Sequence, residues 1–371
     1  MKRSVFSFLF FLVLVSSSWA VDYAPFNYPD ADGGSTYLTG IRGDTDPNVV
    51  MTGVYTPVGT SNTQGLIYSG ALDNSGVWNV LNATISGETV TSTALYGPNT
   101  VSPGTIIVVG SYKNNVSGAV DHGLLYTGAP DGSGTYQNLD AALPGEVNTI
   151  AHSTHGNMVV GNYDTGIVGK AFVYNLTTPA FSDLSKPGAL SITAYGVWHN
   201  SGTSYTIAGG FSNTNGEGLD EGYLVDYDSS TGLTTHWTEF NYNNASTGDL
   251  VSHFDGITGD GADGYNLTGD WLGAGETYNF GFFAHIGRNE DGTFTSADWT
   301  DISYTGALLT SGNSVFENTV IGIYLNPGDP TTYGYLATVP EPNIIGLIAL
   351  GGFVVFVSAS IRFGRLKRHE E

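Results

Sequence analysis

The chain has 371 residues, no cysteine, and 34 acidic against 11 basic side chains, which gives a formal net charge of −23. Without cysteine it can form no disulfide, no zinc–thiolate site and no thiol nucleophile, so its stability must come from a sizeable hydrophobic core. A surface this acidic repels phosphate backbones, which excludes nucleic acid as a partner.

The first 20 residues have the pattern of a secretory signal peptide. Lys2 and Arg3 are followed by an apolar stretch from Val5 to Val15 and then by small residues up to Ala20. We expect cleavage after Ala20, which leaves a body of roughly residues 21–338. That body carries five of the basic residues and 31 of the acidic ones, a formal charge of −26.

The body is rich in Gly, Ser, Thr, Asn and Asp, and Leu and Ala rarely recur at helical spacing. This composition predicts short β-strands joined by tight turns. A length of about 320 residues allows one large all-β domain or two ordinary ones. Internal repetition decides between these two interpretations.

A phrase of the form hydrophobic-x-Gly-x-aromatic occurs six times in the body. Its glycines are separated by 48 to 60 residues, a period typical of propeller blades. The six glycines are Gly53, Gly110, Gly161, Gly209, Gly269 and Gly322.

Each copy contains further strand signals. A second strand, led by a small residue, follows each glycine, and in five copies that residue is itself a glycine. A third phrase, aromatic-x-x-apolar, closes five of the copies, as in Trp78–Leu81 and Trp299–Ile302. A short apolar or Thr-rich stretch ahead of each copy supplies an innermost strand. Glycine at matching places in both strands suggests that neighbouring blades approach closely there.

The sixth copy lacks the third phrase, and Tyr23–Phe26 at the start of the body has the missing pattern without a partner of its own. The sequence therefore predicts an all-β fold, a six-bladed β-propeller closed by the N-terminal strand, over residues 21–338. A pair of β-sandwiches and a β-helix are the alternatives. The phrases also resemble the short extracellular repeats of bacterial surface proteins called HAF repeats.

Candidate chemistry is sparse. Propellers bind ligands where loops converge or in the central channel, and a few polar side chains lie in or just after the expected innermost strands. They are His152, His155, His199, His253, Asp255 and Asp260, of which the last three form the densest group. Isolated polar residues on solvated loops are the simpler interpretation. We therefore predict no catalytic, cofactor-binding or metal-binding residue, and no cofactor.

Two Asp-rich turns, Asp30–Gly33 and Asp260–Gly264, contain oxygen ligands suited to calcium. Neither continues to the bidentate acid of a full calcium loop. Asx-Gly turns in an acidic β-protein explain them without a metal.

The last 33 residues, 339–371, form a separate segment. Pro340, Glu341 and Pro342 precede an uncharged apolar run over residues 344–361, which is long enough to span a bilayer. Four basic residues within 362–368 follow and mark the end that stays cytoplasmic. The sequence thus predicts a C-terminal transmembrane helix with the body on the far side.

These three parts, in this order at the C-terminus, resemble the PEP-CTERM sorting signal of Gram-negative bacteria. The resemblance covers only the tail, and a plain C-terminal anchor is the alternative. It implies recognition by an exosortase, processing of the tail, and delivery of the body from the inner membrane to the cell surface or extracellular matrix.

The main expectation is therefore a non-enzymatic, exported surface or matrix protein. The alternatives are a propeller enzyme acting on extracellular polysaccharide and a carbohydrate-binding module without catalysis. Extracellular polysaccharide is a candidate partner in all three cases.

Overall fold

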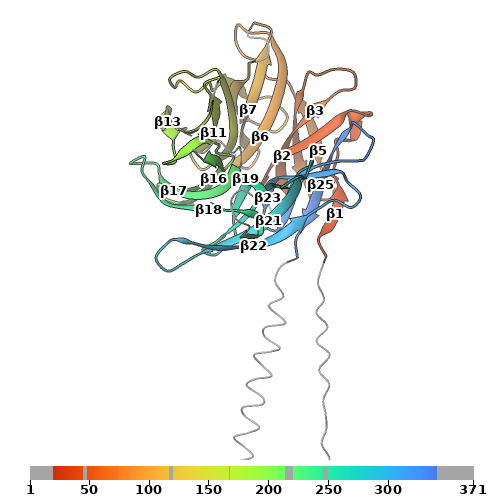
Figure 1. Ribbon diagram of the computed structural model, residues 1–371. Helices are drawn as coiled ribbons and strands as arrows, with labels where there is room; N and C mark the ends of the chain where they lie inside the picture. Colours follow the sequence, from red (N-terminus) through yellow and green to blue (C-terminus); the bar gives the residue numbers. More distant parts are fainter. Residues whose placement is uncertain are drawn as a thin grey trace, which may run out of the picture. The chain divides into compact units, whose positions relative to one another are not determined.

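The computed structural model describes residues 20–340, apart from 45–47, 117–119, 167, 214–219 and 245–249. Within that part the chain forms 25 strands and two short 3₁₀ helices, η1 (Pro29–Ala31) and η2 (Tyr242–Asn244). The strands make six antiparallel sheets, each one blade of a six-bladed β-propeller (Figure 1). The prediction of an all-β, six-bladed fold is confirmed.

Blades 1, 2, 3 and 5 each use four consecutive strands, which follow one another from the channel outward. Blade 1 consists of β2 (Ser35–Gly43), β3 (Val49–Thr56), β4 (Gln64–Gly70) and β5 (Val77–Leu81). Blade 2 consists of β6 (Val90–Ser102), β7 (Thr105–Asn114), β8 (His122–Gly128) and β9 (Thr135–Asn138). Blade 3 consists of β10 (Asn148–His155), β11 (Met158–Asp164), β12 (Gly169–Asn175) and β13 (Ala180–Leu184). Blade 5 consists of β19 (Leu250–Gly259), β20 (Tyr265–Gly273), β21 (Phe280–Arg288) and β22 (Phe294–Ile302).

Blade 4 differs because its innermost strand is interrupted. Two pieces, β14 (Ala189–Ile192) and β15 (Gly196–Ser201), both pair with β16 (Ser204–Asn213). The blade continues outward with β17 (Asp220–Asp228) and β18 (Thr234–Phe240). The sequence predicts one innermost strand over residues 192–195, whereas most of that stretch is the gap between the two pieces.

Blade 6 is built from both ends of the body. From the channel outward it contains β23 (Leu309–Phe316), β24 (Thr319–Leu325), β25 (Thr332–Thr338) and then β1 (Asp22–Pro25). Four residue pairs join β1 to β25, from Asp22 with Thr338 to Pro25 with Tyr335. Figure 1 shows β1, in red, beside β25, in blue. The predicted closure of the ring by the N-terminal strand is confirmed.

The glycine of each hydrophobic-x-Gly-x-aromatic phrase is explained by a close approach within its own blade. A Cβ at Gly110 would lie 2.0 Å from the carbonyl oxygen of Ala94 in β6, and a Cβ at Gly322 would lie 1.8 Å from that of Ser311 in β23. The other four glycines face the matching carbonyl of their own innermost strand at 1.9 to 2.4 Å. The expectation that these glycines mark contacts between blades is therefore wrong.

The second set of glycines does lie at contacts between blades. A Cβ at Gly65 would meet the side chain of Leu95 in blade 2 at 2.6 Å, and a Cβ at Gly334 would meet Leu38 in blade 1 at 2.9 Å. Glycine at these places lets an innermost strand pack directly on the sheet before it. For this set the predicted close approach of neighbouring blades is confirmed.

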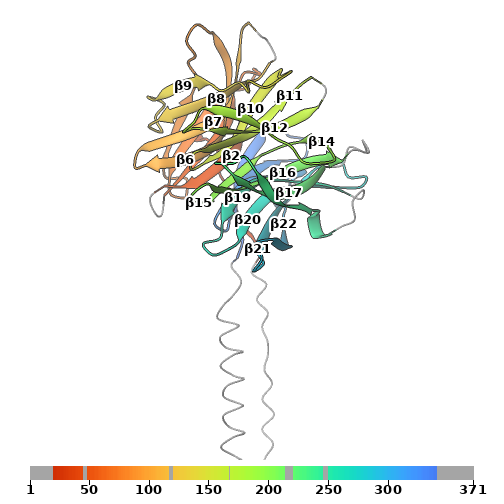
Figure 2. The same cartoon turned by 90° about the vertical axis from the view of Figure 1, so that its left-hand side faces the viewer.

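The hydrophobic core lies between the blades. One cluster joins Leu81 of blade 1 to Leu95 and Leu124 of blade 2, and another joins Val160 of blade 3 to Ile207 of blade 4. Figure 2 shows blades 2 and 3 side by side, with their sheets packed face to face. The second strand of a blade, such as β3 or β11, is buried on both faces, so the alternating pattern of a half-exposed sheet is weak there.

The propeller has two faces. We call the face where the innermost strands begin, for example at Ser35 in blade 1, the start face, and the face where they end, at Gly43, the end face. β25 runs in the same direction as β23. Phe316 of β23 and Thr338 of β25 both pair with Thr319 of β24, so Thr338 lies at the end face, as Phe316 does. Asp22 pairs with Thr338, so both ends of the propeller lie at the end face.

Several predicted segments lie outside the described residues. They are residues 1–19 of the expected signal peptide (1–20), Glu341 and Pro342 of the sorting motif, the span at 344–361 and the basic tail at 362–368. The residues flanking them, Ala20 and Pro340, are described. In the part of the chain that the structure describes, no helix is long and apolar enough to cross a bilayer.

Candidate functional site in the central channel

A β-bulge occurs at the same place in five of the six innermost strands. The ladder shifts, for example, between Leu38 and Gly40 in β2 and between Phe254 and Gly256 in β19. In blade 4 the gap between β14 and β15 takes the place of the bulge. A bulge re-aims a side chain, and here it turns one residue per blade toward the channel. These six residues, the channel ring, are Thr39, Tyr96, His152, Tyr195, Asp255 and Asn313.

All six residues of the channel ring line one cavity of about 550 Å³. Its walls continue toward the start face with side chains from blades 1 and 2, among them Tyr37, Thr56, Thr63, Lys113 and Asp121. A volume of this size suits a small organic ligand or a few units of a polymer.

The residues that follow the channel ring close the space below it. They are small, and neighbouring blades meet there backbone to backbone. A Cβ at Gly97 would lie 2.6 Å from the Cα of Ser153, and one at Gly256 would lie 2.7 Å from the Cα of Ser314. Among the described residues the cavity is therefore closed toward the end face and continues toward the start face.

Arg42 blocks the channel further down. Its side chain is 6% exposed and crosses from blade 1 to the opposite blade 4, where Nη2 donates to the carbonyl oxygen of Val197 at 3.3 Å. The guanidinium also lies 5.8 Å from the ring centre of Trp198. Burial lowers the pKa of Arg42 to about 10, so the group stays charged at neutral pH.

One side of the cavity is a wall of rings from successive blades. The ring of His152 lies 5.0 Å from that of Tyr96 and 4.6 Å from that of Tyr195, and Tyr195 lies 5.7 Å from His253. Burial lowers the pKa of His152 to about 3, so this imidazole is neutral near pH 7. The rings of Tyr96, His152 and Tyr195 therefore offer flat faces to the cavity, with hydroxyl groups on the two tyrosines.

The opposite side of the channel ring is polar and rigidly held. Thr39 Oγ1 donates to the carbonyl oxygen of Leu95, and Asn313 Nδ2 donates to that of Leu38, both at 2.6 Å. Each of these bonds ties one blade to the next. The positions of the ring residues are thus fixed by the propeller itself and not by loops.

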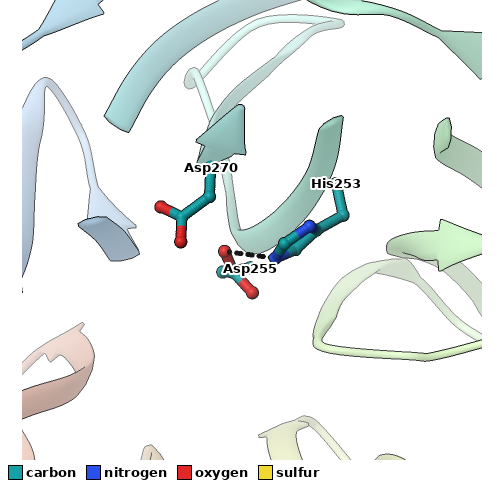
Figure 3. Close-up of side chains that lie close together, drawn as sticks. All are labelled: His253, Asp255 and Asp270. Carbon is teal, nitrogen blue, oxygen red and sulfur yellow. Dashed lines mark ion pairs between the residues drawn. The ribbon is translucent and has the colours of Figure 1, made fainter. Parts of the chain in front are cut away.

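Asp255 is the acidic member of the channel ring, and His253 and Asp270 lie beside it (Figure 3). The His253 Nε2 atom is 3.4 Å from Asp255 Oδ2, and the ligand atoms of all three side chains lie within 4.8 Å of one another. His253 and Asp255 come from β19, and Asp270 comes from β20, directly opposite His253 in the ladder.

Asp270 also connects blade 5 to blade 6. Its Oδ1 accepts a hydrogen bond from the backbone N–H of Gly312 at 3.0 Å, and its Oδ2 accepts one from Ser311 Oγ at 3.0 Å. The side-chain amide of Asn279 reaches the same Oδ2 at 3.5 Å. Asp270 is 8% exposed, so these donors replace the water that the carboxylate has lost.

The two carboxyl groups are crowded into a poorly solvated place. Burial raises the pKa of Asp255 to about 8, the neighbouring His253 opposes this rise, and the charge of Asp270 adds to it. Burial also raises the pKa of Asp270, against the hydrogen bonds that it accepts. Near pH 7 the pair therefore holds a proton, and Asp255 can act as an acid.

The spacing of His253, Asp255 and Asp270 would also allow a metal ion to be held. Both oxygens of Asp270, however, already accept hydrogen bonds from blade 6. A metal would have to displace or share these bonds, so we treat the cluster as a set of proton-exchanging groups.

The structure separates the other residues singled out in the sequence. His155 and His199 lie toward the end face, where the backbone N–H of His199 donates to the imidazole Nδ1 of His155 at 2.8 Å. Burial lowers the pKa of His155 to about 3. Asp260 is not part of the group with His253. It pairs with His285 at 3.0 Å and accepts the backbone N–H groups of Ala262 and Gly264.

The turn at Asp260–Gly264 is thus an Asx turn, as its simpler interpretation predicts.

Sequence reasoning missed Asp270, although a signal was present. Asp270 directly follows the glycine of the fifth phrase, at a repeat position that none of the other five copies fills with an acid. Those residues are Val54, Ser111, Asn162, Gly210 and Ile323.

No family model matches the chain, and no curated protein matches it. Solved structures do align with it. An α-L-arabinanase of Penicillium chrysogenum in complex with arabinobiose is 12% identical over 86% of this chain and 98% of that chain, with a TM-score of 0.48. An α-L-arabinofuranosidase of Fusarium graminearum with arabinobiose is 12% identical over 85% and 95%, with a TM-score of 0.47. A sialidase of Trypanosoma rangeli with the inhibitor DANA is 12% identical over 91% and 60%, with a TM-score of 0.46.

These structures correct the expectation of a non-enzymatic surface or matrix protein. They are named as an arabinanase, an arabinofuranosidase and a sialidase, and against these names the prediction that the chain is not an enzyme is not kept. At 12% identity and TM-scores below 0.5 the likeness itself carries no argument about activity. The case for an activity must therefore come from the cavity and its residues.

Proposed function

We propose that the chain is an exported enzyme that cleaves glycosidic bonds of an extracellular polysaccharide. The observation that carries this proposal is Asp255, a carboxyl group that holds its proton near neutral pH at the floor of a cavity that continues toward the start face. A protonated carboxyl is the group that glycoside cleavage needs, because the leaving oxygen must gain a proton as its bond breaks.

The cavity also suits a sugar. The ring wall of Tyr96, His152 and Tyr195 offers flat surfaces for a pyranose or furanose face, and the hydroxyl and amide groups of Thr39 and Asn313 lie opposite. Hydrogen-bonding groups placed on rigid strands discriminate well between related polar ligands.

Among the described residues that line the cavity, Asp121 is the other acid besides Asp255, and its Oδ2 lies 3.4 Å from Lys113 Nζ. We assign it the role of base. In the proposed reaction Asp255 gives its proton to the glycosidic oxygen as the carbon–oxygen bond breaks. Water adds to the anomeric carbon and gives a proton to Asp121. Proton exchange with solvent then restores both groups, so one water is consumed and two sugar hydroxyls are formed.

The test is release of reducing sugar from a panel of purified polysaccharides, arabinan included, by the wild-type protein and by Asp255→Asn. We expect one polysaccharide to be cleaved, and the variant to lose at least about 100-fold in rate because general acid catalysis contributes that much. A matched control is Asp260→Asn, which removes a carboxylate next to β19 that lies outside the cavity. Equal rates for wild type and Asp255→Asn would refute the role of Asp255. Binding of a polysaccharide without any cleavage would favour a carbohydrate-binding module.

Export and sorting are part of the proposal. Two features of the sequence support a route through the inner membrane to the cell surface or extracellular matrix. One is the signal peptide pattern ending at Ala20, and the other is the motif of Pro340, Glu341 and Pro342 with the apolar and basic segments that follow it. The partner on that route would be an exosortase. Mass spectrometry of the mature protein in its native host tests this, since an intact residue 1 and an intact basic tail would contradict it.

A further inference from the structure

Asp270 has a counterpart in blade 3 that carries no charge. Asn162 follows the glycine of its own phrase as Asp270 does, and its Oδ1 accepts the backbone N–H of Ala194 in the next blade at 2.9 Å. Asp270 makes the same contact, through Oδ1, to Gly312 in blade 6 at 3.0 Å. An asparagine is therefore sufficient to connect two blades at this position, and the connection does not explain why residue 270 is an acid.

The negative charge of Asp270 has one conspicuous neighbour, Asp255. Their carboxylate oxygens lie within 4.8 Å, and both groups are largely buried, since Asp270 is 8% exposed and the Asp255 side chain is 19% exposed. Two carboxylates this close cannot both remain ionised without a large electrostatic cost, so one of them takes a proton.

The hydrogen-bond donors decide which carboxyl takes the proton. The Gly312 N–H and the Asn279 amide donate to Asp270, and the Ser311 hydroxyl, which also has Asn313 Oδ1 within 2.6 Å, lies 3.0 Å from Asp270 Oδ2. Among the described residues, the only group that can donate to Asp255 is the ring of His253, at 3.4 Å. Donors stabilise the charged form of a carboxyl group, so the charge stays on Asp270 and the proton goes to Asp255.

We propose that Asp270 is a positioning residue for Asp255: the blade 5–blade 6 connection fixes a negative charge beside Asp255 and so keeps Asp255 in its acid form. This inference rests on the proposed function for its biological meaning. It is nevertheless a statement about two carboxyl groups that holds with or without a substrate.

Burial is the largest cause of the raised pKa of Asp255, and of the charged groups around the pair only Asp270 adds to it. From β19, His253 faces Asp255 and opposes proton uptake by it. Tyr195 of blade 4 and Asn313 of blade 6 are its neighbours in the channel ring, and Tyr335 of β25 lies on the Asp270 side. Asp270 is the only acid among the described residues that acts on Asp255 at this range.

The experiment is a carbon-13 NMR titration of the aspartate carboxyls in the protein without any substrate, for the wild type and for Asp270→Asn. The variant keeps an oxygen that accepts the Gly312 N–H, as Asn162 does for Ala194. We expect the midpoint of the Asp255 titration to move down by about one pH unit or more, because a like charge has been removed. The alkaline limit of polysaccharide cleavage should move down by the same amount.

The reciprocal exchange, Asn162→Asp, is the matched control. It retains the contact to Ala194 and places a new charge in blade 3, and it should leave the midpoint of Asp255 unchanged. An unchanged midpoint in Asp270→Asn, in a protein that is folded, would overturn the proposal.

Asp270→Ser keeps the test decisive in case Asp270→Asn does not fold, because serine fills the same repeat position in blade 2, as Ser111. It removes the charge beside Asp255, so Asp255 should again ionise at lower pH. No change in this variant would also overturn the proposal. Because these readouts need no substrate, absence of cleavage would contradict the proposed function alone.

Discussion

Asp255 shows how a single buried group links the stability of the fold to pH. Its pKa is about 8 in the folded protein, against an ordinary value of 3.8. Between these values the folded state binds a proton that the unfolded state has lost, so the folded state is favoured at low pH and stability falls as pH rises. Above about pH 8 this contribution is lost completely.

We therefore expect the melting temperature of the wild type to fall more steeply between about pH 5 and pH 8 than that of Asp255→Asn, which has no proton to lose at this position. Thermal unfolding followed by circular dichroism at several pH values measures the difference. Parallel curves for the two proteins would show that Asp255 ionises normally.

At the scale of residues the sequence was only partly informative. It placed His253 and Asp255 together because they are two apart on one strand. It added Asp260 because of its proximity in sequence, although a bulge and a turn direct that side chain elsewhere. Asp270 is 15 residues away from Asp255 in the sequence, and only the pairing register of β19 and β20 brings it close.

The repeating element of this propeller is a bulged strand together with a glycine. At each bulge, and at the gap that replaces it in blade 4, a backbone carbonyl oxygen occupies the space where a Cβ of the second strand would lie. The repeated phrase therefore needs a glycine because the backbone of the neighbouring strand, where it turns a residue toward the channel, leaves no room for a side chain. The sequence predicted the strands and their order from this phrase, but the bulges themselves leave no separate pattern.

Gly110→Ala should consequently destabilise the protein by more than about 2 kcal/mol, because the new Cβ meets the backbone oxygen of Ala94 at 2.0 Å and the strand has to move. Gly169→Ala is the matched control, since the nearest atom to its Cβ is 3.6 Å away, in the side chain of Ser191. Urea unfolding of both variants measures the difference. Similar midpoints would mean that the bulge can relax without cost.

For the whole molecule, closure of the ring depends on one of the shortest strands. Only four residue pairs hold β1 to β25, but Phe26 directly after it is 1% exposed, and its N–H donates to the carbonyl oxygen of Gly334 at 2.8 Å. Without this strand, β25 would become an open edge, and the contact between blades 6 and 1 would lose Phe26.

Deleting residues 21–30 should therefore lower the melting temperature of the entire propeller in one cooperative step, as measured by differential scanning calorimetry. Tyr23→Ala provides a milder comparison, because it keeps the backbone pairing with Ala337 and removes only the ring. A deletion variant with an unchanged melting temperature would contradict closure by β1.

The end face carries a last consequence. The chain enters the propeller at Asp22 and leaves it at Val339, whose N–H donates to the carbonyl oxygen of Asn318 in the hairpin at the end of β23. The cavity is reached from the other side, past Tyr37 and Thr56. A resin or a fused partner joined directly at Asp22 or Val339 would therefore be attached at the face opposite the cavity. Immobilised in this way, the propeller would leave its cavity turned outward and unobstructed for long polymers in the surrounding medium.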